Sequence, residues 1–276
     1  MAVRYELRCD NGDRWELSMS AGPVKLHDDP DGVEGAEFSF DDQQDVDQPG
    51  VTFRARMFAP NLIGLDCKVG PVRPGVEACE LLARWRRSLG NGVQLHEFHA
   101  ISDWGGDRFQ VVRLAGKLPK PPMAQMRAAG VVLHDKVTLR SDESWWRKRP
   151  AVRTFTPAEF AGAVIVSESE EPVWPHFVIR GPITLPTIGV AGEAVPLPTI
   201  PAGDEWTVET DPNWFAITDG TGADRSWVGR RWYTRAPAVA AGSGGSVDVP
   251  VTITGTGTTA QTSVTVTLPQ LFYGAF

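Results

Sequence analysis

Histidine is the residue type in this sequence that most readily suggests a metal site. His96 and His99 are three positions apart, with Glu97 between them. The segment alternates like a strand, and residues three apart on a strand point to opposite faces. The pattern also differs from HExxH, in which two histidines share one helix face. We therefore predict no metal site at these histidines.

The cysteines form neither a redox motif nor a metal motif. They are Cys9, Cys67 and Cys79, an odd number with no CxxC spacing. Structural disulfides are therefore not expected, and the pattern favours a reducing site of synthesis.

Motifs for nucleophilic catalysis and phosphate binding are also missing from the sequence. No GxSxG motif occurs, so no strained turn is indicated that would present a catalytic serine. Residues 220–222 read GTG, like a fragment of a phosphate-binding loop, but Arg225 and Trp227 follow instead of a helix pattern. A hairpin turn explains this segment better. We predict no catalytic residue, no cofactor-binding residue, no cofactor and no enzymatic activity.

Carboxylates are concentrated in residues 27–50, a stretch rich in Gly, Asp and Pro that is expected to be a long loop. A glycosidase needs two carboxylates across a cleft, but a solvated loop contains acidic runs as well. Long loops in compact domains are usually functional or flexible. The candidate residues of this loop are Asp28, Asp29, Asp31, Asp41, Asp42, Asp45 and Asp47.

Tryptophans in the C-terminal part suggest a second kind of site. An exposed Trp beside polar residues can stack on the face of a sugar, whereas a buried Trp packs in a core or across strands. The core interpretation is stronger for Trp206 and Trp214. We predict that Trp227 and Trp232 are the candidate exposed aromatics.

Bulk composition limits the fold and the partners. The chain has 276 residues, a net charge of −7, 28 Gly and 22 Pro. Gly and Pro oppose helix interiors, so a helical bundle is excluded. The negative charge and the lack of a basic cluster argue against nucleic-acid recognition. No apolar run is long enough to span a membrane, and residues 1–10 do not resemble a secretory signal peptide.

Hydrophobic periodicity predicts a mainly β chain with one helix. Residues 1–20 read as two short strands around an Asn-Gly turn, and residues 51–58 read as a strand. A Gly/Pro-rich turn is expected next, followed by an amphipathic helix over about 75–89, with Pro74 before it and Gly90 after it. Further strands are expected over 93–98, 108–114 and 131–139.

Composition changes between residues 155 and 173, where an acidic polar segment occurs. We therefore predict two domains, 1–170 and 171–276. The second consists of short strands separated by turn signals, which is typical of a β-sandwich or jelly roll.

Two motifs stand out in the second region. Residues 175–182 read PHFVIRGP, and residues 202–212 read AGDEWTVETDP, with an Asp-Gly turn at 219–220. This pattern resembles the C-terminal half of the distal tail proteins, or minor tail proteins, of long-tailed siphophages, and residues 264–269 resemble the final strand of that family. The resemblance covers roughly residues 172–276, and the order of elements in the first region supports it.

The resemblance implies a ring, usually a hexamer, at the distal end of a phage tail. The N-terminal domain would form the ring, and a galectin-like or jelly-roll sandwich would project from it. The expected partners are the tail tube protein, the tape-measure protein and the baseplate hub, and the expected location is the tail tip of the virion. The family supplies no catalytic residues.

The acidic loop fits this expectation in one respect, because acidic walls repel DNA phosphates. Some of the seven aspartates are therefore expected to face the lumen of the ring or a neighbouring subunit, although a solvated loop explains them equally well. The alternative function is a carbohydrate-binding β-sandwich module, and a hydrolase with an unrecognised site is a third possibility.

Overall fold

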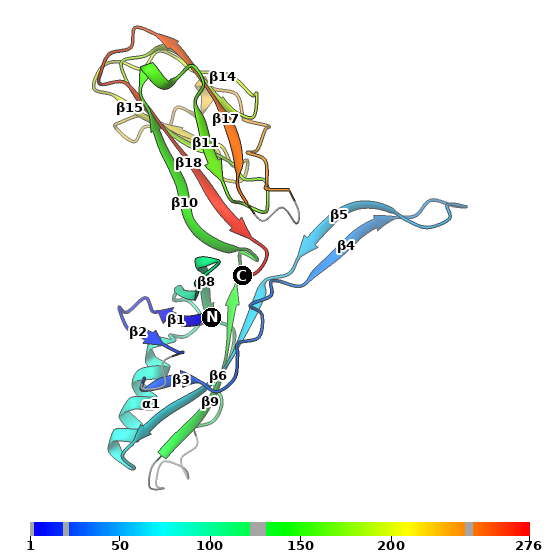
Figure 1. Ribbon diagram of the computed structural model, residues 1–276, viewed down its shortest axis with the longest axis vertical. Coiled ribbons are helices and arrows are strands. Elements are labelled where there is room, and N and C mark those ends of the chain that lie inside the picture. The colour runs from blue at the N-terminus through cyan, green and yellow to red at the C-terminus, as the bar shows by residue number, and fades with distance from the viewer. Residues whose placement is uncertain (1–2, 19–21, 122–130, 241–244) are drawn as a thin grey trace. The chain divides into compact units, whose positions relative to one another are not determined.

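The computed structural model describes residues 3–18, 22–121, 131–240 and 245–276. The chain forms two compact units (Figure 1). Unit 1 comprises Met1–Arg147 and Tyr273–Phe276, and unit 2 comprises Lys148–Phe272. The sequence predicts a domain boundary near residue 170. That boundary refers to segments that fold independently, which compactness does not test, so it stays a prediction. Within the described ranges, no helix is long and apolar enough to cross a membrane.

The first sheet of unit 1 is antiparallel and has the order β2-β1-β7-β8. Its strands are β1 (Val3–Arg8), β2 (Arg14–Glu16), β7 (His96–Ser102) and β8 (Gly106–Leu114). The start of β10 (Trp146–Phe155) adds to β8 through the pair Arg147 and Phe109. β1 and β2 confirm the hairpin predicted over 1–20, of which residues 1–2 and 19–20 lie outside the described part.

The second sheet of unit 1 joins β3, β6 and β9, and β9 also pairs with the end of β8. Its strands are β3 (Val24–Leu26), β6 (Asn61–Val72) and β9 (Val131–Ser141). One side of β6 is buried because Ile63, Leu65, Cys67 and Val69 alternate along it.

The Gly/Pro-rich turn predicted before the helix is wrong, because β6 occupies most of that segment. Gly64 lies inside the strand, and the Gly70-Pro71 pair coincides with a register shift between Val69 and Val72. Glycine and proline mark an irregularity of a long strand here rather than a connection.

The predicted helix is confirmed as α1 (Val76–Ser88). Ala78, Leu82 and Trp85 form its buried side, and the helix packs on β6. The Trp85 ring lies 5.4 Å from that of Trp15 in an edge-to-face arrangement. α1 therefore covers the apolar side of the second sheet.

A two-stranded hairpin interrupts the segment predicted as one long loop. Its strands are β4 (Phe38–Gln43) and β5 (Thr52–Phe58), and the latter confirms the strand predicted over 51–58. The loop prediction is wrong for 38–43, where pairing with β5 imposes extended structure on an acidic sequence.

Unit 2 is a β-sandwich. One sheet has the order β16-β15-β12-β18-β10 and the other has β11-β17-β13-β14. The strands are β11 (Val164–Ser167), β12 (His176–Arg180), β13 (Thr184–Val190), β14 (Val195–Pro196), β15 (Glu205–Glu209), β16 (Ala216–Thr218), β17 (Val247–Thr256) and β18 (Ser263–Phe272). Two short 3₁₀ helices, η2 (Pro157–Glu159) and η3 (Ser226–Val228), lie in the connections.

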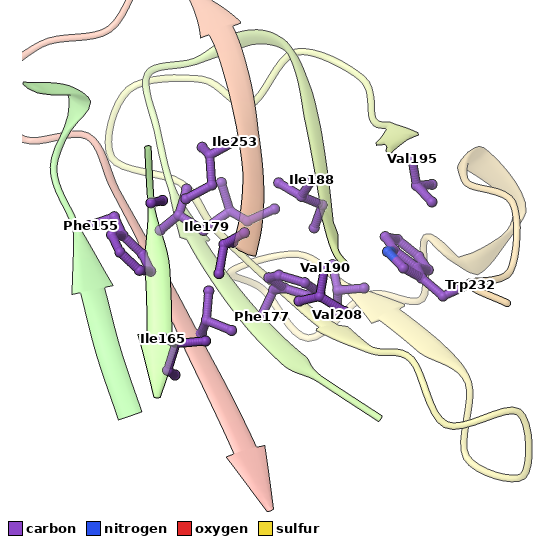
Figure 2. Packing of buried hydrophobic residues seen from close by; sticks show 14 of the residues in the cluster. Phe155, Ile165, Phe177, Ile179, Ile188, Val190, Val195, Val208, Trp232 and Ile253 are labelled. Carbon is purple, nitrogen blue, oxygen red and sulfur yellow. The ribbon is translucent and has the colours of Figure 1, made fainter. Parts of the chain in front are cut away.

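Aliphatic and aromatic side chains from both sheets fill the sandwich (Figure 2). Phe177 and Ile179 of β12 are fully buried, as are Ile188 and Val190 of β13. This packing confirms the predicted mainly β chain with sandwich-type domains.

Candidate assembly surface

The β4–β5 hairpin exposes aromatic rings on one face. Phe38 pairs with Phe58 and Phe40 with Arg56, and these four side chains share that face. A register shift beside Asp41 and Asp42 brings Phe53 onto it too, with its ring 5.9 Å from that of Phe40. Phe38, Phe40 and Phe53 are 45%, 58% and 60% exposed. Exposed apolar patches of this kind mark interaction sites.

Arg56 contacts the aromatic face without covering it. Its guanidinium carbon lies 4.4 Å from the ring centroid of Phe58 and 5.7 Å from that of Phe38. A guanidinium over an aromatic ring is favourable, so Arg56 fixes the geometry of the two rings nearest the base of the hairpin.

The base of the hairpin is anchored in unit 1 by packing and hydrogen bonds. The Phe58 ring packs edge-on against Trp145 with 4.8 Å between centroids. The Tyr273 hydroxyl donates to the Ala36 carbonyl at 3.0 Å, and the Ser144 hydroxyl donates to the Ala59 carbonyl at 2.7 Å. These contacts position the base of the hairpin and leave its outer half exposed.

Four of the predicted acidic residues lie in the outer half of the hairpin. Asp41 and Asp42 end β4, and Asp45 and Asp47 belong to the turn. All four are exposed, and residues 41–52 contain no Lys or Arg. Hydrogen bonds within the turn order it: the Gln43 amide donates to Asp45 at 2.8 Å, and the Asp45 N–H donates to the Gln48 side chain at 3.1 Å.

The other three predicted aspartates lie before the hairpin and do not join this group. Asp28 and Asp29 are exposed and line a groove together with Tyr5, Leu17 and Leu26. Asp31 exchanges two backbone hydrogen bonds with Gly64 of β6, at 3.1 and 3.2 Å. The seven residues thus divide between a hairpin and a segment lying along the second sheet.

The side of the second sheet opposite its buried face carries basic side chains. Lys25 of β3 lies directly opposite Lys68 of β6, and Lys68 lies directly opposite His134 of β9. Lys136 is two residues further along β9, with its ammonium 3.3 Å from the Asp66 carboxylate. We call Lys25, Lys68, His134 and Lys136 the basic face. The basic face was not predicted from the sequence, because a Gly/Pro-rich turn was expected in the segment that forms β6.

Buried charges in the first sheet form ion pairs. The Glu6 side chain is fully buried and accepts hydrogen bonds from Arg8 and from Arg14, the latter at 2.5 Å. Burial alone would raise the pKa of Glu6, but these two guanidinium groups outweigh it and lower the pKa below its usual value. His99 bridges Asp107 at 2.7 Å and Glu97 at 3.1 Å.

His96, Cys9 and Cys67 are buried structural residues. His96 bonds the Leu89 carbonyl at 3.1 Å, away from the partners of His99. Burial raises the pKa of Cys9 to about 11 and that of Cys67 to about 12, so neither is a thiolate at neutral pH. The described residues contain no group of three or more His, Cys, Asp or Glu that could hold a metal ion.

The two aromatics predicted to be exposed in unit 2 differ. Trp227 in η3 is 77% exposed, whereas Trp232 is 1% exposed and packs near Phe177 and Phe215. The expectation for Trp232 is therefore wrong, because its indole fills the core of the sandwich (Figure 2). Trp214, which was expected to be buried, is 75% exposed.

The glycine-rich segment at 220–222 is a turn closed by Asp219. The Asp219 carboxylate accepts the Thr221 hydroxyl at 2.6 Å, the Ala223 N–H at 3.1 Å and the Arg225 guanidinium at 2.8 Å. These bonds, the one from Thr221 first, hold the pKa of Asp219 far below its usual range. The donors that a phosphate would need are already used by this carboxylate.

Comparisons with solved structures show a fold shared along the whole chain. The Dit protein (gp 19.1) of phage SPP1, described as a paradigm of the hub adsorption apparatus of phages that infect Gram-positive bacteria, matches with a TM-score of 0.62 and 8% identity. The match covers 99% of this chain and 100% of that chain.

The baseplate of phage P2 in its activated conformation also contains similar chains. The form with Ca matches with a TM-score of 0.55 and 11% identity, and the form with Sr with a TM-score of 0.54 and 10% identity. Each match covers 98% of both chains. No protein-family model and no curated protein matches this chain. The chain thus has the fold of phage hub and baseplate proteins.

Proposed function

We propose that this protein is a structural component of a phage tail tip, a distal tail protein that joins the tail tube to the baseplate hub. The similarity of the whole chain to the phage SPP1 Dit protein carries this proposal. The match covers 99% of this chain, so both units lie within it.

The exposed aromatic hairpin supports a role in assembly. A hairpin of two strands has little stability of its own in water, and a surface that covers it would stabilise it. We infer that several copies form a closed ring, as a hexamer, in which the partners include the tail tube protein, the tape-measure protein and the hub. A closed ring also covers sheet edges that would otherwise promote aggregation.

The mass of the purified protein in solution tests the ring. Six chains of 30.1 kDa give a particle of about 180 kDa. We expect this mass by native mass spectrometry and a ring with a central opening by negative-stain electron microscopy. A monomer at all concentrations, with no ring on the grids, contradicts the proposed ring.

Partner binding tests the position in the tail. The assembled protein is expected to cap tail-tube polymers at one end, which electron microscopy of mixtures would show. Localisation at the virion tail tip is expected by gold-labelled antibodies against unit 2. No labelling of virions, or labelling along the whole tail, contradicts the proposed location.

Sugar binding by unit 2 is a second candidate function, favoured by the exposed indoles of Trp214 and Trp227. Aromatic faces of this kind stack on sugars. Glycan binding that Trp227→Ala abolishes and Trp206→Phe retains would support it. A lack of binding to any glycan by the assembled protein would contradict it.

A further inference from the structure

Residues 273–276 follow β18 directly and pack as a part of unit 1. The Ala275 N–H donates to the Val33 carbonyl at 2.8 Å, and the Arg108 guanidinium of β8 donates to the Gly274 carbonyl at 2.8 Å. Ala275 is fully buried. We call Tyr273–Phe276 the return segment. It is a packed piece of unit 1 that the chain supplies only after the whole of unit 2.

Tyr273 joins the return segment to the base of the hairpin. Its ring centroid lies 6.1 Å from that of Phe38, where β4 begins, and 6.1 Å from that of Phe58, where β5 ends. Its hydroxyl donates to the Ala36 carbonyl at 3.0 Å. One side chain of the return segment thus contacts both strands of the hairpin and the residues that lead into it.

Gly35 leaves the space that Tyr273 occupies. Its φ is +120°, and a Cβ at this position would lie 2.6 Å from the Tyr273 carbonyl oxygen and 2.9 Å from the nearest atom of the Tyr273 ring. A backbone oxygen cannot rotate away as the end of a flexible side chain can, so a larger residue at position 35 would displace the return segment. The return segment and residues 33–36 are therefore fitted to each other at backbone distance.

The hairpin depends on contacts at its base. A hairpin of two strands is at best marginally stable alone in water, and the residues of β4 and β5 are almost all exposed. The rings of Phe38 and Phe58 meet that of Tyr273 at the base. Removing the Tyr273 ring should therefore let the hairpin open more often.

The folding of unit 2 changes how easily the return segment docks. If unit 2 is unfolded, residues 148–272 are a flexible connection, and bringing the ends of a long flexible connection together costs entropy. In the folded unit 2 the Lys148 ammonium lies 5.1 Å from the ring centroid of Phe272, so the two ends already meet. For a connection of this length, a folded unit 2 should favour docking of the return segment by roughly a hundredfold.

We propose that the return segment makes the order of the β4–β5 hairpin depend on the folding of unit 2. A chain whose unit 2 is unfolded lacks the docked Tyr273, so its hairpin opens and its aromatic face is not presented in a fixed geometry. The coupling is reciprocal, since the docked return segment stabilises the folded unit 2 by the same free energy. The device acts within one chain and does not require the proposed ring.

Hydrogen exchange of the backbone amides of β4 and β5 tests the role of Tyr273. It is measured on single chains, in dilute solution where native mass spectrometry shows 30.1 kDa, so the result does not depend on whether a ring forms. In Tyr273→Ala we expect these amides to exchange about tenfold faster, because the hairpin opens locally more often, while the amides of β7 keep their rate. Tyr273→Phe keeps the ring and should exchange at close to the original rate.

Gly35→Ala displaces the return segment from the opposite side and should have the same effect as Tyr273→Ala. The matched control is Tyr233→Ala in unit 2, which removes a tyrosine ring that is 75% exposed and should leave the exchange of the hairpin unchanged. Unchanged hairpin exchange in Tyr273→Ala overturns the proposal. Equal acceleration in β7 overturns it too, because Tyr273 would then hold unit 1 as a whole.

A double-variant cycle tests the dependence on unit 2. Phe177→Ala leaves a cavity in the core of the sandwich and destabilises unit 2. In urea near the unfolding midpoint of unit 2, we expect Phe177→Ala to accelerate hairpin exchange in the original chain but not in the Tyr273→Ala chain. The same acceleration in both chains, or in neither, overturns the proposal. A protein that forms no ring overturns the proposed ring and leaves this coupling standing.

Discussion

Unit 1 and unit 2 differ in what they bury and in what they expose. Within the described residues, unit 1 buries ionisable side chains that include Glu6, His99 and Asp135, whereas the corresponding buried ionisable residue of unit 2 is Asp219. Unit 1 also exposes the aromatic face of the hairpin, while the core of unit 2 is almost entirely aliphatic and aromatic.

Packing of apolar side chains therefore dominates the interior of unit 2, whereas the interior of unit 1 also contains buried ion pairs such as that of Glu6 with Arg14. Buried ion pairs specify geometry more than they stabilise, because dehydrating each charge opposes its attraction to the partner. An exposed aromatic face does not stabilise a single chain, because its rings stay in contact with water. It stabilises an assembly in which another surface covers the rings.

Separate expression of unit 2 should give the largest effect. A fragment covering 148–272 is expected to unfold cooperatively in urea, whereas a fragment covering 171–276 is expected to lack a stable fold. The shorter one lacks β10 and β11 altogether, and with them the buried Phe155 and Ile165. Each large core side chain contributes about 2–5 kcal/mol, against a total of about 5–15 kcal/mol. Equal urea midpoints for the two fragments would instead support the boundary at 170.

Removing the buried carboxylate of Asp135 should give the next largest effect. It accepts the Arg86 guanidinium at 2.6 Å and the Trp85 indole N–H at 3.1 Å, which ties α1 to β9. Asp135→Asn leaves Arg86 without its countercharge and should lower the free energy of unfolding of unit 1 by about 3 kcal/mol.

The control for Asp135 is the more exposed ion pair between Arg84, on the same helix, and Asp13, in the turn between β1 and β2, at 2.6 Å. Asp13→Asn should cost less than about 1 kcal/mol because solvent screens that pair. Urea titration of both variants measures the difference. Equal losses in the free energy of unfolding would show that burial does not strengthen the contribution of the Asp135 pair to stability.

The buried Glu6 should make unit 1 sensitive to acid. Its pKa is lowered in the folded protein from an ordinary 4.5, so folding favours the ionised form. The resulting stabilisation is complete above pH 4.5 and is lost as the pH falls through the lower pKa of the folded state. At pH 7, Glu6→Gln should lower the free energy of unfolding by about 1–3 kcal/mol, and the loss should shrink as the pH falls below 4.5.

Thermal unfolding of the original protein and the Glu6→Gln variant between pH 3 and pH 7 measures this dependence. Glu16→Gln is the matched control, since that carboxylate is partly exposed and 4.0 Å from Arg14. A difference in stability between the original protein and Glu6→Gln that stays constant across this pH range would contradict the stabilising role of the ionised Glu6 carboxylate.

The aromatic hairpin should give the smallest effect on a single chain. Phe40→Ser with Phe53→Ser removes exposed rings, so the free energy of unfolding of the monomer should change by no more than about 0.5 kcal/mol. The same variant should assemble poorly, as sedimentation velocity would show. A large loss of monomer stability would mean that the rings pack within their own chain.

Elements with strong local signals could be predicted from the sequence. α1 has a clear apolar side and flanking Pro74 and Gly90, and β5 alternates regularly. β6 was missed because Gly64, Gly70 and Pro71 outweighed the alternation of its buried residues. β4 was missed because six residues rich in Asp become a strand only through pairing with β5, which is a tertiary effect.

The candidate surfaces were harder to predict. The aspartates of the hairpin could be found as an acidic run, but their separation from Asp28 and Asp31 depends on strand pairing. The basic face depends on Lys25, Lys68 and His134, which are far apart in sequence and meet only in the register of three strands. Composition cannot show such a surface, because acidic residues elsewhere give the chain its net charge of −7.

The chain enters unit 2 at Lys148 and leaves it at Phe272, and these two residues touch. The Lys148 ammonium lies 5.1 Å from the ring centroid of Phe272, on strands β10 and β18 that are neighbours in one sheet. The sandwich is therefore inserted into the chain of unit 1 through two adjacent strands, β10 and β18, so its first and last residues are neighbours although 124 positions separate them in the sequence.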